Sequence, residues 1–296
     1  MSPTLRGYAQ VAAAAVLWGT LGPAARSLFA SGLTPLEGAT WRATGAFVLL
    51  LVYSLLQDRR ALRVAWRDLL LFAAYGAVSV AGFMTVYFTA ISLTTVATAA
   101  VLLYTAPAWV VVLARVFFGE PMTPMKAAAV GLSFAGCVLV TGAFGGSAVR
   151  PTAGGVLAGL GAGLTYALYS IFGKAALRRH SPLTTVVYAT GFGALFLAVA
   201  AGGLPRLTAA SLPPLGYTVV FPTAAAYLLY IGGLRWVEAG RASIIATLEP
   251  VVAAAAGALV LHEAFGVVQW IGAALVLAGV VLVQGEQVVR RSNHPP

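Results

Sequence analysis

The chain has 296 residues, of which 60% are hydrophobic and 9% are charged, and its mean hydropathy is +0.91. About a quarter of the residues of a soluble domain are charged, so this composition excludes a soluble globular protein and predicts an integral membrane protein. The apolar runs leave no stretch polar enough for a separate extramembrane domain. Any function must therefore belong to the membrane-spanning body.

Ten apolar runs, each long enough to cross a bilayer as a helix, follow one another along the chain. They cover residues 8–30, 35–56, 69–91, 95–118, 124–143, 153–177, 182–203, 214–235, 241–262 and 266–285. The first run is too long for the apolar core of a signal peptide and leads into further spans, so we expect it to be retained. The predicted fold class is an all-α polytopic membrane protein with ten transmembrane helices.

The net charge of +10 comes from Lys and Arg residues between the apolar runs, without the aromatic-interleaved patch typical of nucleic-acid binding. Cytoplasmic loops of membrane proteins are enriched in Lys and Arg, so these residues report orientation. With both termini in the cytoplasm, fourteen of the 18 basic residues fall on that side: Arg6, Arg59, Arg60, Arg63, Arg67, Arg115, Lys126, Lys174, Arg178, Arg179, Arg235, Arg241, Arg290 and Arg291. The other side receives Arg26, Arg42, Arg150 and Arg206. We therefore predict cytoplasmic termini.

Few residues could support catalysis or metal binding. Cys137 is the only cysteine, which excludes an internal disulfide and a thiolate metal cluster and fits a small buried hydrophobic residue. His180, His262 and His294 have neither metal-ligand spacing nor a nucleophile-base arrangement. A membrane-embedded enzyme acting on lipid or isoprenoid would need a polar catalytic constellation at an interface. We therefore expect no enzymatic activity, no metal and no cofactor.

An internal repeat relates the two halves of the chain. A shift of 143 residues aligns Tyr87 with Tyr230, Pro107 with Pro250, Glu120 with Glu263, and residues 135–142 with residues 278–285. Nearer the amino terminus of each half the shift is 148 residues, which pairs Trp18 with Tyr166. Each half then holds five spans, and because five is odd, the second half enters the membrane from the opposite side. This predicts an inverted-topology repeat, an architecture common among secondary transporters.

The motifs that carry a family resemblance extend from about residue 8 to residue 285. They are Val16-Leu-Trp-Gly19, the segment from Pro35 to Arg42, Pro107 with Gly119-Glu120, and Leu248-Glu-Pro250 with His262-Glu263. Each is weak alone, but together, at the repeat spacing and in a ten-span frame, they resemble the drug/metabolite transporter superfamily, specifically its EamA-type exporters. The chain departs from the family where His262-Glu263 replaces the usual Gly-Glu pair, so no role is assigned to His262.

The resemblance implies two five-helix EamA repeats, residues 1–147 and 148–288, followed by a basic cytoplasmic tail over residues 289–296. It implies a central cavity between the repeats, the fifth and tenth helices set to the side, and transport by alternating access. EamA-type exporters carry amino acids and other small metabolites, and relatives carry nucleotide sugars or lipophilic cations. The implied location is the inner membrane of a bacterium.

Glu249 is the charged residue that is hardest to place in a bilayer. It lies about nine residues into its predicted helix, or about 13 Å deep at 1.5 Å per residue, near the centre of a core about 30 Å thick. A charge there costs about 2.5 to 3.5 kcal/mol. Its predicted helical neighbours Ala242, Ala246, Ala253 and Ala256 are all small. Two roles stay open: a carboxylate used in gating, proton transfer or binding of a substrate ammonium group, and a structural brace.

Pro107 and Pro250 occupy matched positions in the two repeats. Each removes one backbone donor, which frees the carbonyl group of Leu103 or Ala246 and favours a kink. We therefore predict a symmetric pair of hinges. The carboxylate beside the second hinge has no counterpart in the first repeat, where the equivalent residue is alanine.

Aromatic and hydroxyl residues at a similar depth form the second candidate group. Trp and Tyr prefer the membrane interfaces, so those near mid-span need a polar partner or a cavity. With Glu249 they make up the predicted substrate-binding set: Trp18, Ser79, Tyr104, Tyr166, Tyr169, Thr223, Tyr227, Tyr230 and Thr247. Ordinary helix packing is the alternative for each. Trp18 and Tyr166 would face each other across the pseudo-twofold axis if both point inward.

Arg42 lies about a turn and a half into its span and has two interpretations, snorkelling to the outer interface or a charge contact with a substrate carboxylate. The charge-poor centre argues against multiply phosphorylated cargo, which needs several deep basic residues. We predict export of small metabolites, best amino acids with aromatic or neutral side chains, and keep efflux of lipophilic cations or drugs as the alternative. The expected partners are a small-molecule substrate and the lipid bilayer, without nucleic acid, and the chain is expected to be a monomer.

Overall fold

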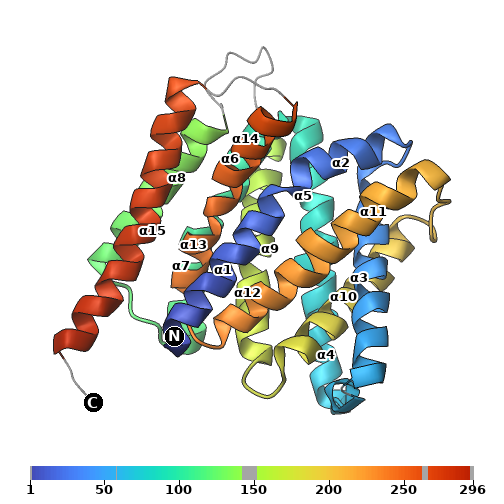
Figure 1. Cartoon of the computed structure of the whole chain (residues 1–296), viewed down its shortest axis with the longest axis horizontal. Helices are drawn as coiled ribbons and strands as arrows, with labels where there is room; N and C mark the ends of the chain where they lie inside the picture. Colours follow the sequence, from blue (N-terminus) through green and yellow to red (C-terminus); the bar gives the residue numbers. More distant parts are fainter. Residues whose placement is uncertain (1, 58, 142–151, 262–265, 294–296) are drawn as a thin grey trace.

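The computed structural model describes residues 2–57, 59–141, 152–261 and 266–293. Eight helical stretches are long and apolar enough to span a membrane: Pro35–Gln57, Trp66–Leu93, Val96–Phe118, Ala153–Ala176, Pro182–Ala200, Ala209–Leu234, Ala239–Leu259 and Val267–Gly285. The other two predicted spans correspond to α8 (Pro124–Val140), a shorter apolar helix, and to α1 (Pro3–Gly19) with α2 (Leu21–Ala30). The predicted all-helical fold class is confirmed over the described residues (Figure 1).

Five of the predicted spans are single helices, and four are divided into two or more helical segments. The former are α3 (Pro35–Gln57), α8, α9 (Ala153–Ala176), α10 (Pro182–Ala200) and α15 (Val267–Asn293). The latter are α4 (Trp66–Ala74), η2 (Tyr75–Gly82) and α5 (Phe83–Leu93); α6 (Val96–Leu103) and α7 (Ala106–Phe118); η3 (Ala209–Ser211), α11 (Leu212–Val219), η4 (Val220–Ala225) and α12 (Ala226–Leu234); and α13 (Ala239–Ala246) and α14 (Leu248–Leu261). A short 3₁₀ helix, η1 (Arg59–Leu62), connects α3 to α4.

The ends of the predicted segments differ in places from the structure. α15 continues to Asn293, through most of the predicted tail, because no proline or glycine interrupts it there. The predicted boundary between the repeats, at residues 147 and 148, lies outside the described residues. So do His262, Glu263 and His294.

Several helices begin with the same local signal, a Ser or Thr cap followed by proline. Ser2, Thr123 and Ser181 each accept a hydrogen bond from the backbone N–H three residues later, and each is followed by a proline in the first turn. The cap satisfies a free backbone donor, and proline is tolerated in the first turn because its missing N–H would have no helical partner there. At the other end, α7 is closed by Gly119, whose φ of 69° favours glycine.

The first helices of the two halves, α1 and α9, run in opposite directions. Gly7, near the start of α1, packs against Trp236. Lys174, near the end of α9, donates to the carbonyl oxygen of Leu234 at 2.7 Å. The start of α1 and the end of α9 therefore meet at the same face, as an inverted repeat requires.

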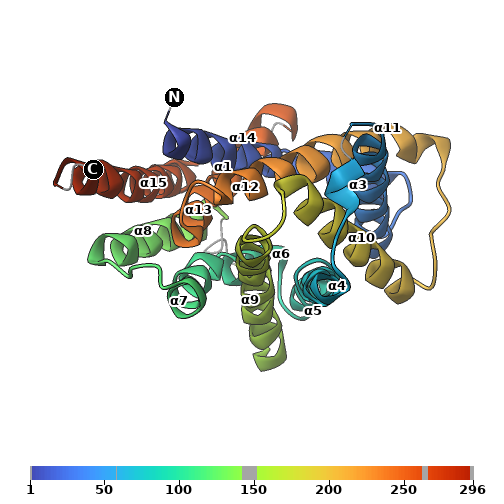
Figure 2. The same ribbon diagram turned by 90° about the horizontal axis from the view of Figure 1, so that it is seen from below.

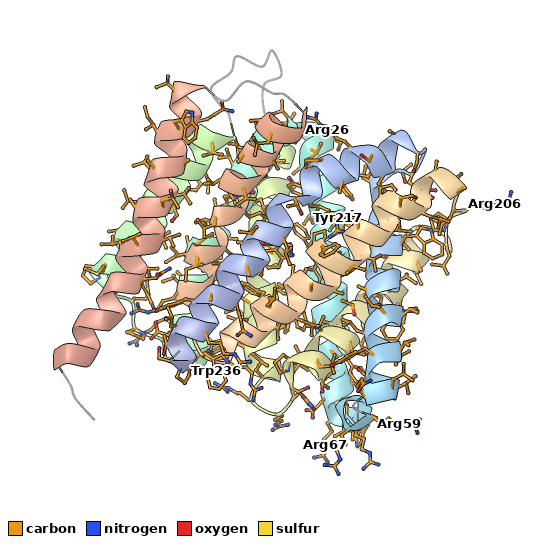
Figure 3. The ribbon with its side chains drawn as sticks, in the orientation of Figure 1. Arg26, Arg59, Arg67, Arg206, Tyr217 and Trp236 are labelled. Carbon is orange, nitrogen blue, oxygen red and sulfur yellow. The ribbon has the colours of Figure 1, made fainter. Side chains whose placement is uncertain are left out.

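We call this face, which carries Arg59, Arg67 and Trp236, the arginine-rich face (Figure 3). Arg26 and Arg206 lie at the opposite face (Figure 3). α1 begins and α15 ends on the arginine-rich side (Figure 1). The assignment of this face to the cytoplasm stays a prediction.

α8 and α15 lie side by side at one end of the molecule, outside the other helices (Figures 1 and 2). Glycines allow their backbones to approach closely: a Cβ atom at Gly136 would lie 2.6 Å from the carbonyl oxygen of Gly272, and one at Gly272 would lie 2.7 Å from that of Gly136. Small residues at such a crossing are typical of tightly packed membrane helices. The two helices thus occupy the lateral position that the resemblance implies for the fifth and tenth spans.

The fourth span of each half is interrupted at an equivalent residue. α6 ends at Leu103 and α13 ends at Ala246, positions that the 143-residue shift relates. A threonine follows in both halves and turns its hydroxyl back to the chain, because Thr105 donates to the carbonyl oxygen of Leu102 and Thr247 donates to that of Ile244, each at 2.6 Å. The same two carbonyl oxygens also accept the backbone N–H groups of these threonines, so each interruption is closed by a tight turn.

The interruptions correct one detail of the sequence analysis. We predicted kinks within continuous helices, but a new helix begins at each site, with Pro107 in the first turn of α7 and Pro250 in α14. Ala242 and Ala246 therefore belong to α13 and Glu249 belongs to α14. The continuous small face predicted around Glu249 does not form.

The third span of each half contains a π-helical segment, η2 or η4, at equivalent places. Such segments widen a helix locally and frequently mark functional sites. In η4, Pro222 contributes no N–H, and Thr223 Oγ1 donates to the carbonyl oxygen of Thr218, five residues earlier, at 2.7 Å. In η2, Gly76 lies against α10, where a Cβ atom would be 2.5 Å from the backbone nitrogen of Gly193. The sequence analysis did not predict either segment.

Candidate functional site

Glu249 lies in the first turn of α14, directly after the interruption at Thr247. Backbone N–H groups in the first turn of a helix have no partner within it, and their dipoles favour a negative charge. The hydroxyl of Tyr166 on α9 donates to Glu249 Oε2 at 3.1 Å. Gly19, at the end of α1, permits close packing on this turn, because a Cβ atom there would lie 2.9 Å from the Glu249 carbonyl oxygen. Helices of both halves therefore meet at this turn, and α9 supplies the hydrogen bond to the carboxylate.

Beside Glu249, five rings form what we call the central aromatic cluster: Trp18, Tyr166, Tyr169, Tyr227 and Tyr230. The centroid of the Trp18 ring lies 6.5 Å from that of Tyr166, 6.0 Å from that of Tyr227 and 5.1 Å from that of Tyr230. Tyr169 lies 5.1 Å from Tyr227 and 6.2 Å from Tyr230. The repeat mates Trp18 and Tyr166 are thus in edge-to-face contact, and five of the six predicted rings, all but Tyr104, belong to one cluster.

The cluster extends to residues that sequence reasoning did not select. Tyr75 of η2 packs on Tyr169, with ring centroids 5.0 Å apart, and Phe83 packs on Tyr166 at 5.5 Å and on Tyr87 at 5.6 Å. Tyr87 could have been found, because the repeat aligns it with Tyr230. Tyr75 and Phe83 carry no such signal in the sequence.

The remaining predicted binding residues have different surroundings. The Thr247 hydroxyl donates to the Ile244 carbonyl oxygen. Tyr104 follows the last residue of α6 and packs on the hydrophobic core. Ser79 lies in η2 and is 5% exposed, and no described residue forms a hydrogen bond with its hydroxyl oxygen. Thr223 accepts a hydrogen bond from Arg42 Nε at 3.2 Å. Thr247 and Tyr104 therefore shape the interruptions, whereas Ser79 and Thr223 lie in the π-helical segments.

Arg42 lines a small cavity rather than extending to the interface. The cavity lies between α3, the two π-helical segments, α5, α10 and α12, and its polar lining residues are Arg42, Thr190, Thr223 and Tyr227. It has room for about one water molecule. Because the guanidinium group is directed to buried Thr223, the snorkelling interpretation does not describe this conformation.

A charged network that sequence reasoning missed joins the two halves at the arginine-rich face. Glu120, in the connection after α7, accepts hydrogen bonds from the backbone N–H groups of Ala239 and Gly240 at 2.7 and 3.1 Å. These groups begin α13, whose own cap residue, Glu238, makes no side-chain capping bond. A carboxylate from the first half therefore caps a helix of the second half. The sequence signals for Glu120 were its place in the repeat and in the Gly119-Glu120 motif, and neither indicated a helix cap.

The same network contains three more charged side chains. Lys126 Nζ lies 2.8 Å from Glu238 Oε2 and 3.9 Å from Glu120 Oε2. Arg241 Nε lies 2.9 Å from Glu238 Oε2, and an Arg241 terminal nitrogen donates to the carbonyl oxygen of Val283 on α15. Lys126 is 1% exposed and Arg241 is 2% exposed. Buried charges of this kind need such partners.

A second charged contact joins the halves at this face. Asp68 on α4 pairs with Arg179 at 3.2 Å and with His180 Nε2 at 3.0 Å. Arg179 is exposed, whereas Asp68 and His180 are partly buried. Neutral hydrogen bonds join the halves at the opposite face, such as Trp41 Nε1 to the Pro205 carbonyl oxygen at 3.0 Å. The described ion pairs between the halves lie at the arginine-rich face.

The charged network predicts acid sensitivity of the folded protein. Burial raises the pKa of Glu238, but the hydrogen bonds and charges of Lys126 and Arg241 outweigh burial and hold this pKa below its usual value. A carboxylate with a lowered folded-state pKa stabilises the protein above its unfolded-state pKa, and this contribution is lost as the pH falls through the folded value. We expect the melting temperature of purified protein to fall below about pH 4.3, and to fall less steeply in Glu238→Gln. Parallel curves for the two proteins would contradict this.

Among the described residues, no three His, Cys, Asp or Glu side chains come together as metal ligands. The functional features are therefore a carboxylate at a helix start, the aromatic cluster beside it, and the charged network that joins the halves at the arginine-rich face. All three lie where the two inverted halves meet. This arrangement suits binding and release of a small molecule between the halves.

Comparison with known proteins gives the same result. The chain matches the EamA-like transporter family over residues 5–142 and 153–284. It is 33% identical over 216 residues to an uncharacterized transporter of Archaeoglobus fulgidus, covering 71% of this chain and 75% of that protein. It is 30% identical over 281 residues to the uncharacterized transporter YwfM of Bacillus subtilis, covering 91% and 90%. It is 25% identical over 296 residues to the uncharacterized inner membrane transporter YicL of Salmonella typhimurium, covering 96% of each.

A solved crystal structure shares the fold. It superposes with a TM-score of 0.82 at 20% sequence identity, over 99% of both chains. At this identity the likeness concerns the fold alone. The family match covers both halves of the chain, and the relatives are transporters by name. The chain therefore belongs to the EamA-like transporter family, within the drug/metabolite transporter superfamily, and is a multi-pass membrane transporter.

Proposed function

We propose that the protein exports small amphiphilic metabolites, best amino acids with aromatic or neutral side chains, by alternating access. Two EamA repeats, residues 1–147 and 148–288, move against each other, which the family match to each half supports. The arginine-rich face is placed in the cytoplasm by the positive-inside rule. The name of the Salmonella relative supports the inner membrane as the location.

The observation that carries this proposal is the position of Glu249. Its carboxylate lies at the start of α14, beside the aromatic cluster that joins the two halves, with the Tyr166 hydroxyl as its side-chain hydrogen-bond partner among the described residues. An ammonium group can take the place of that hydroxyl and form a stronger, charge-assisted bond. The rings of Trp18 and Tyr227 then supply apolar contact for a neutral or aromatic side chain.

Efflux of lipophilic cations is the second candidate, because the same features favour it. Glu249 would be the counter-charge, and the tyrosine and tryptophan faces would attract the cation. An amino acid carries a carboxylate and such a cation does not. The amino-acid candidate therefore requires a contact for that carboxylate in addition to Glu249, and the cation candidate does not.

Competition in inside-out vesicles tests the proposal. We expect saturable, protein-dependent uptake of radiolabelled L-phenylalanine that unlabelled L-leucine inhibits and tetraphenylphosphonium does not. Vesicles without the protein are the control. Saturable uptake of tetraphenylphosphonium that neither amino acid inhibits would favour the second candidate and reject the first.

A further inference from the structure

Arg42 is the charged residue whose surroundings the proposed role of Glu249 does not explain. It is the eighth residue of α3, about 10 Å along the helix from its start at the opposite face. At that depth a charged side chain costs free energy unless it is paired or faces water. Its hydrogen-bond partners therefore decide what it does.

The hydrogen bonds of Arg42 leave part of the guanidinium group unused. Its Nε donates to Thr223 Oγ1, which is held in turn by the Thr218 carbonyl oxygen. The nearest acidic residue on the same helix, Glu37, is engaged at the helix start, where it accepts from the Thr34 N–H at 2.7 Å. Within the described part of the chain, no residue accepts a hydrogen bond from the two terminal nitrogens of Arg42. A guanidinium group has five N–H donors, so several remain for a ligand.

The walls of the cavity leave these donors accessible from inside the protein. Both π-helical segments contribute to it, η2 through Val80 and η4 through Thr223. Thr190 already donates to carbonyl oxygens of its own helix, at 2.7 and 3.1 Å, and its hydroxyl can still accept. The remaining lining is apolar, apart from Tyr227. Among the described residues, Arg42 is therefore the one cationic group that lines this cavity.

The cavity and the Glu249 site are linked through the aromatic cluster. Tyr227 lines the cavity and packs on Trp18, and Trp18 packs on Tyr166, which holds Glu249. Arg42 and Glu249 also attract each other electrostatically across this cluster. The site thus has a positive end and a negative end with aromatic rings between them.

We propose that Arg42 binds the carboxylate of the substrate through its terminal nitrogens while Glu249 takes the ammonium group. This inference rests on the proposed function and makes a zwitterion, rather than a lipophilic cation, the fitting substrate. A planar guanidinium group suits a carboxylate because it can donate two parallel hydrogen bonds. The cavity now has room for about one water molecule, so the walls must separate when a carboxylate enters, a motion that alternating access supplies.

The test compares a substrate with and without its carboxylate in Arg42→Gln and wild type. L-Phenylalanine and L-phenylalaninamide share the ring and the amine, and only the first carries a carboxylate. In inside-out vesicles we expect Arg42→Gln to lower phenylalanine uptake by about tenfold or more, and to change phenylalaninamide uptake by less than about twofold. Arg206→Gln is the matched control, because Arg206 is an exposed arginine at the same face, and both uptakes should stay at the wild-type level.

Arg42→Lys keeps the charge but loses the parallel pair of hydrogen bonds. We expect Arg42→Lys to have a severalfold higher KM for phenylalanine and an unchanged KM for the amide. If Arg42→Gln does not fold, Arg42→Lys provides the test instead. Equal losses for acid and amide, or no loss for either, would overturn the assignment of Arg42 while leaving the proposed function intact. Absence of amino-acid transport in wild type would overturn both.

Discussion

Glu249→Gln should abolish most transport without unfolding the protein. Glutamine has the same shape, and its carbonyl oxygen can still accept the hydrogen bond from Tyr166. The charge that binds an ammonium group is lost, and a hydrogen bond to a charged group is worth about 1.5 to 3 kcal/mol. We therefore expect uptake of L-phenylalanine into inside-out vesicles to fall by about ten- to a hundredfold. The melting temperature should stay equal or rise, because an ionised group in the membrane interior is replaced by a neutral one.

Two further variants separate the charge from its surroundings. Glu37→Gln removes a half-buried carboxylate near the opposite face, where α3 begins, and should transport at the wild-type rate. Tyr166→Phe keeps the ring on Trp18 but removes the hydroxyl, so it should retain more transport than Glu249→Gln. If protonation of Glu249 is a step of the cycle, the residual transport of Glu249→Gln will lose the pH dependence of wild type. Unchanged rates together with unchanged pH dependence would assign Glu249 a purely structural role.

The features that repeat in the sequence were the ones that could be predicted. Apolar runs about 20 residues long located the spans, and matched residues such as Trp18 and Tyr166 came together because the repeat places them at related positions. Pro107 and Pro250 also marked where the two fourth spans are interrupted. What they could not reveal is that each fourth span restarts as a second helix, which puts Glu249 in a first turn, where the helix dipole favours its charge.

Other features depend on contacts between distant segments and left no local pattern. A π-helical segment differs from an α-helix by one hydrogen-bond register, and the apolar sequence of η2 is equally suitable for either. The sequence left two interpretations of Arg42 because the position of Thr223 beside it depends on how α3 meets η4. Glu120 was a marker of the repeat and of the family motif and Lys126 a signal of orientation, and neither use revealed that Glu120 caps α13 and that Lys126 pairs with Glu238 of the other half.

The contrast between the two faces suggests how the halves open. At the arginine-rich face, opening must separate buried ion pairs and remove a helix cap. At the opposite face, neutral hydrogen bonds between the halves must break, such as Tyr217 to Thr20 at 2.8 Å. A neutral hydrogen bond contributes about 1 kcal/mol and a bond to a charged group about twice as much. The described conformation is therefore held more firmly at the arginine-rich face.

Glu120→Ala should be the most destabilising of the substitutions at this face. It removes both acceptors from the Ala239 and Gly240 N–H groups and takes one carboxylate from buried Lys126. Loss of a helix cap costs about 1 kcal/mol, and loss of one partner of a buried ion pair costs about 3 to 5 kcal/mol. The second figure is an upper bound here, because Lys126 keeps Glu238 at 2.8 Å. We expect the melting temperature in detergent to fall by several degrees.

The control for this prediction is a pair of variants in the same network. Glu120→Gln keeps one oxygen as an acceptor for the α13 start, so it should lose less stability than Glu120→Ala. Adding Lys126→Met to Glu120→Ala removes the cation that was left with a single carboxylate, so the double variant should lose less than the sum of the two single losses. Additive losses would mean that Glu120 acts on α13 alone. A melting temperature of Glu120→Ala equal to wild type would show that this carboxylate does not hold the halves together.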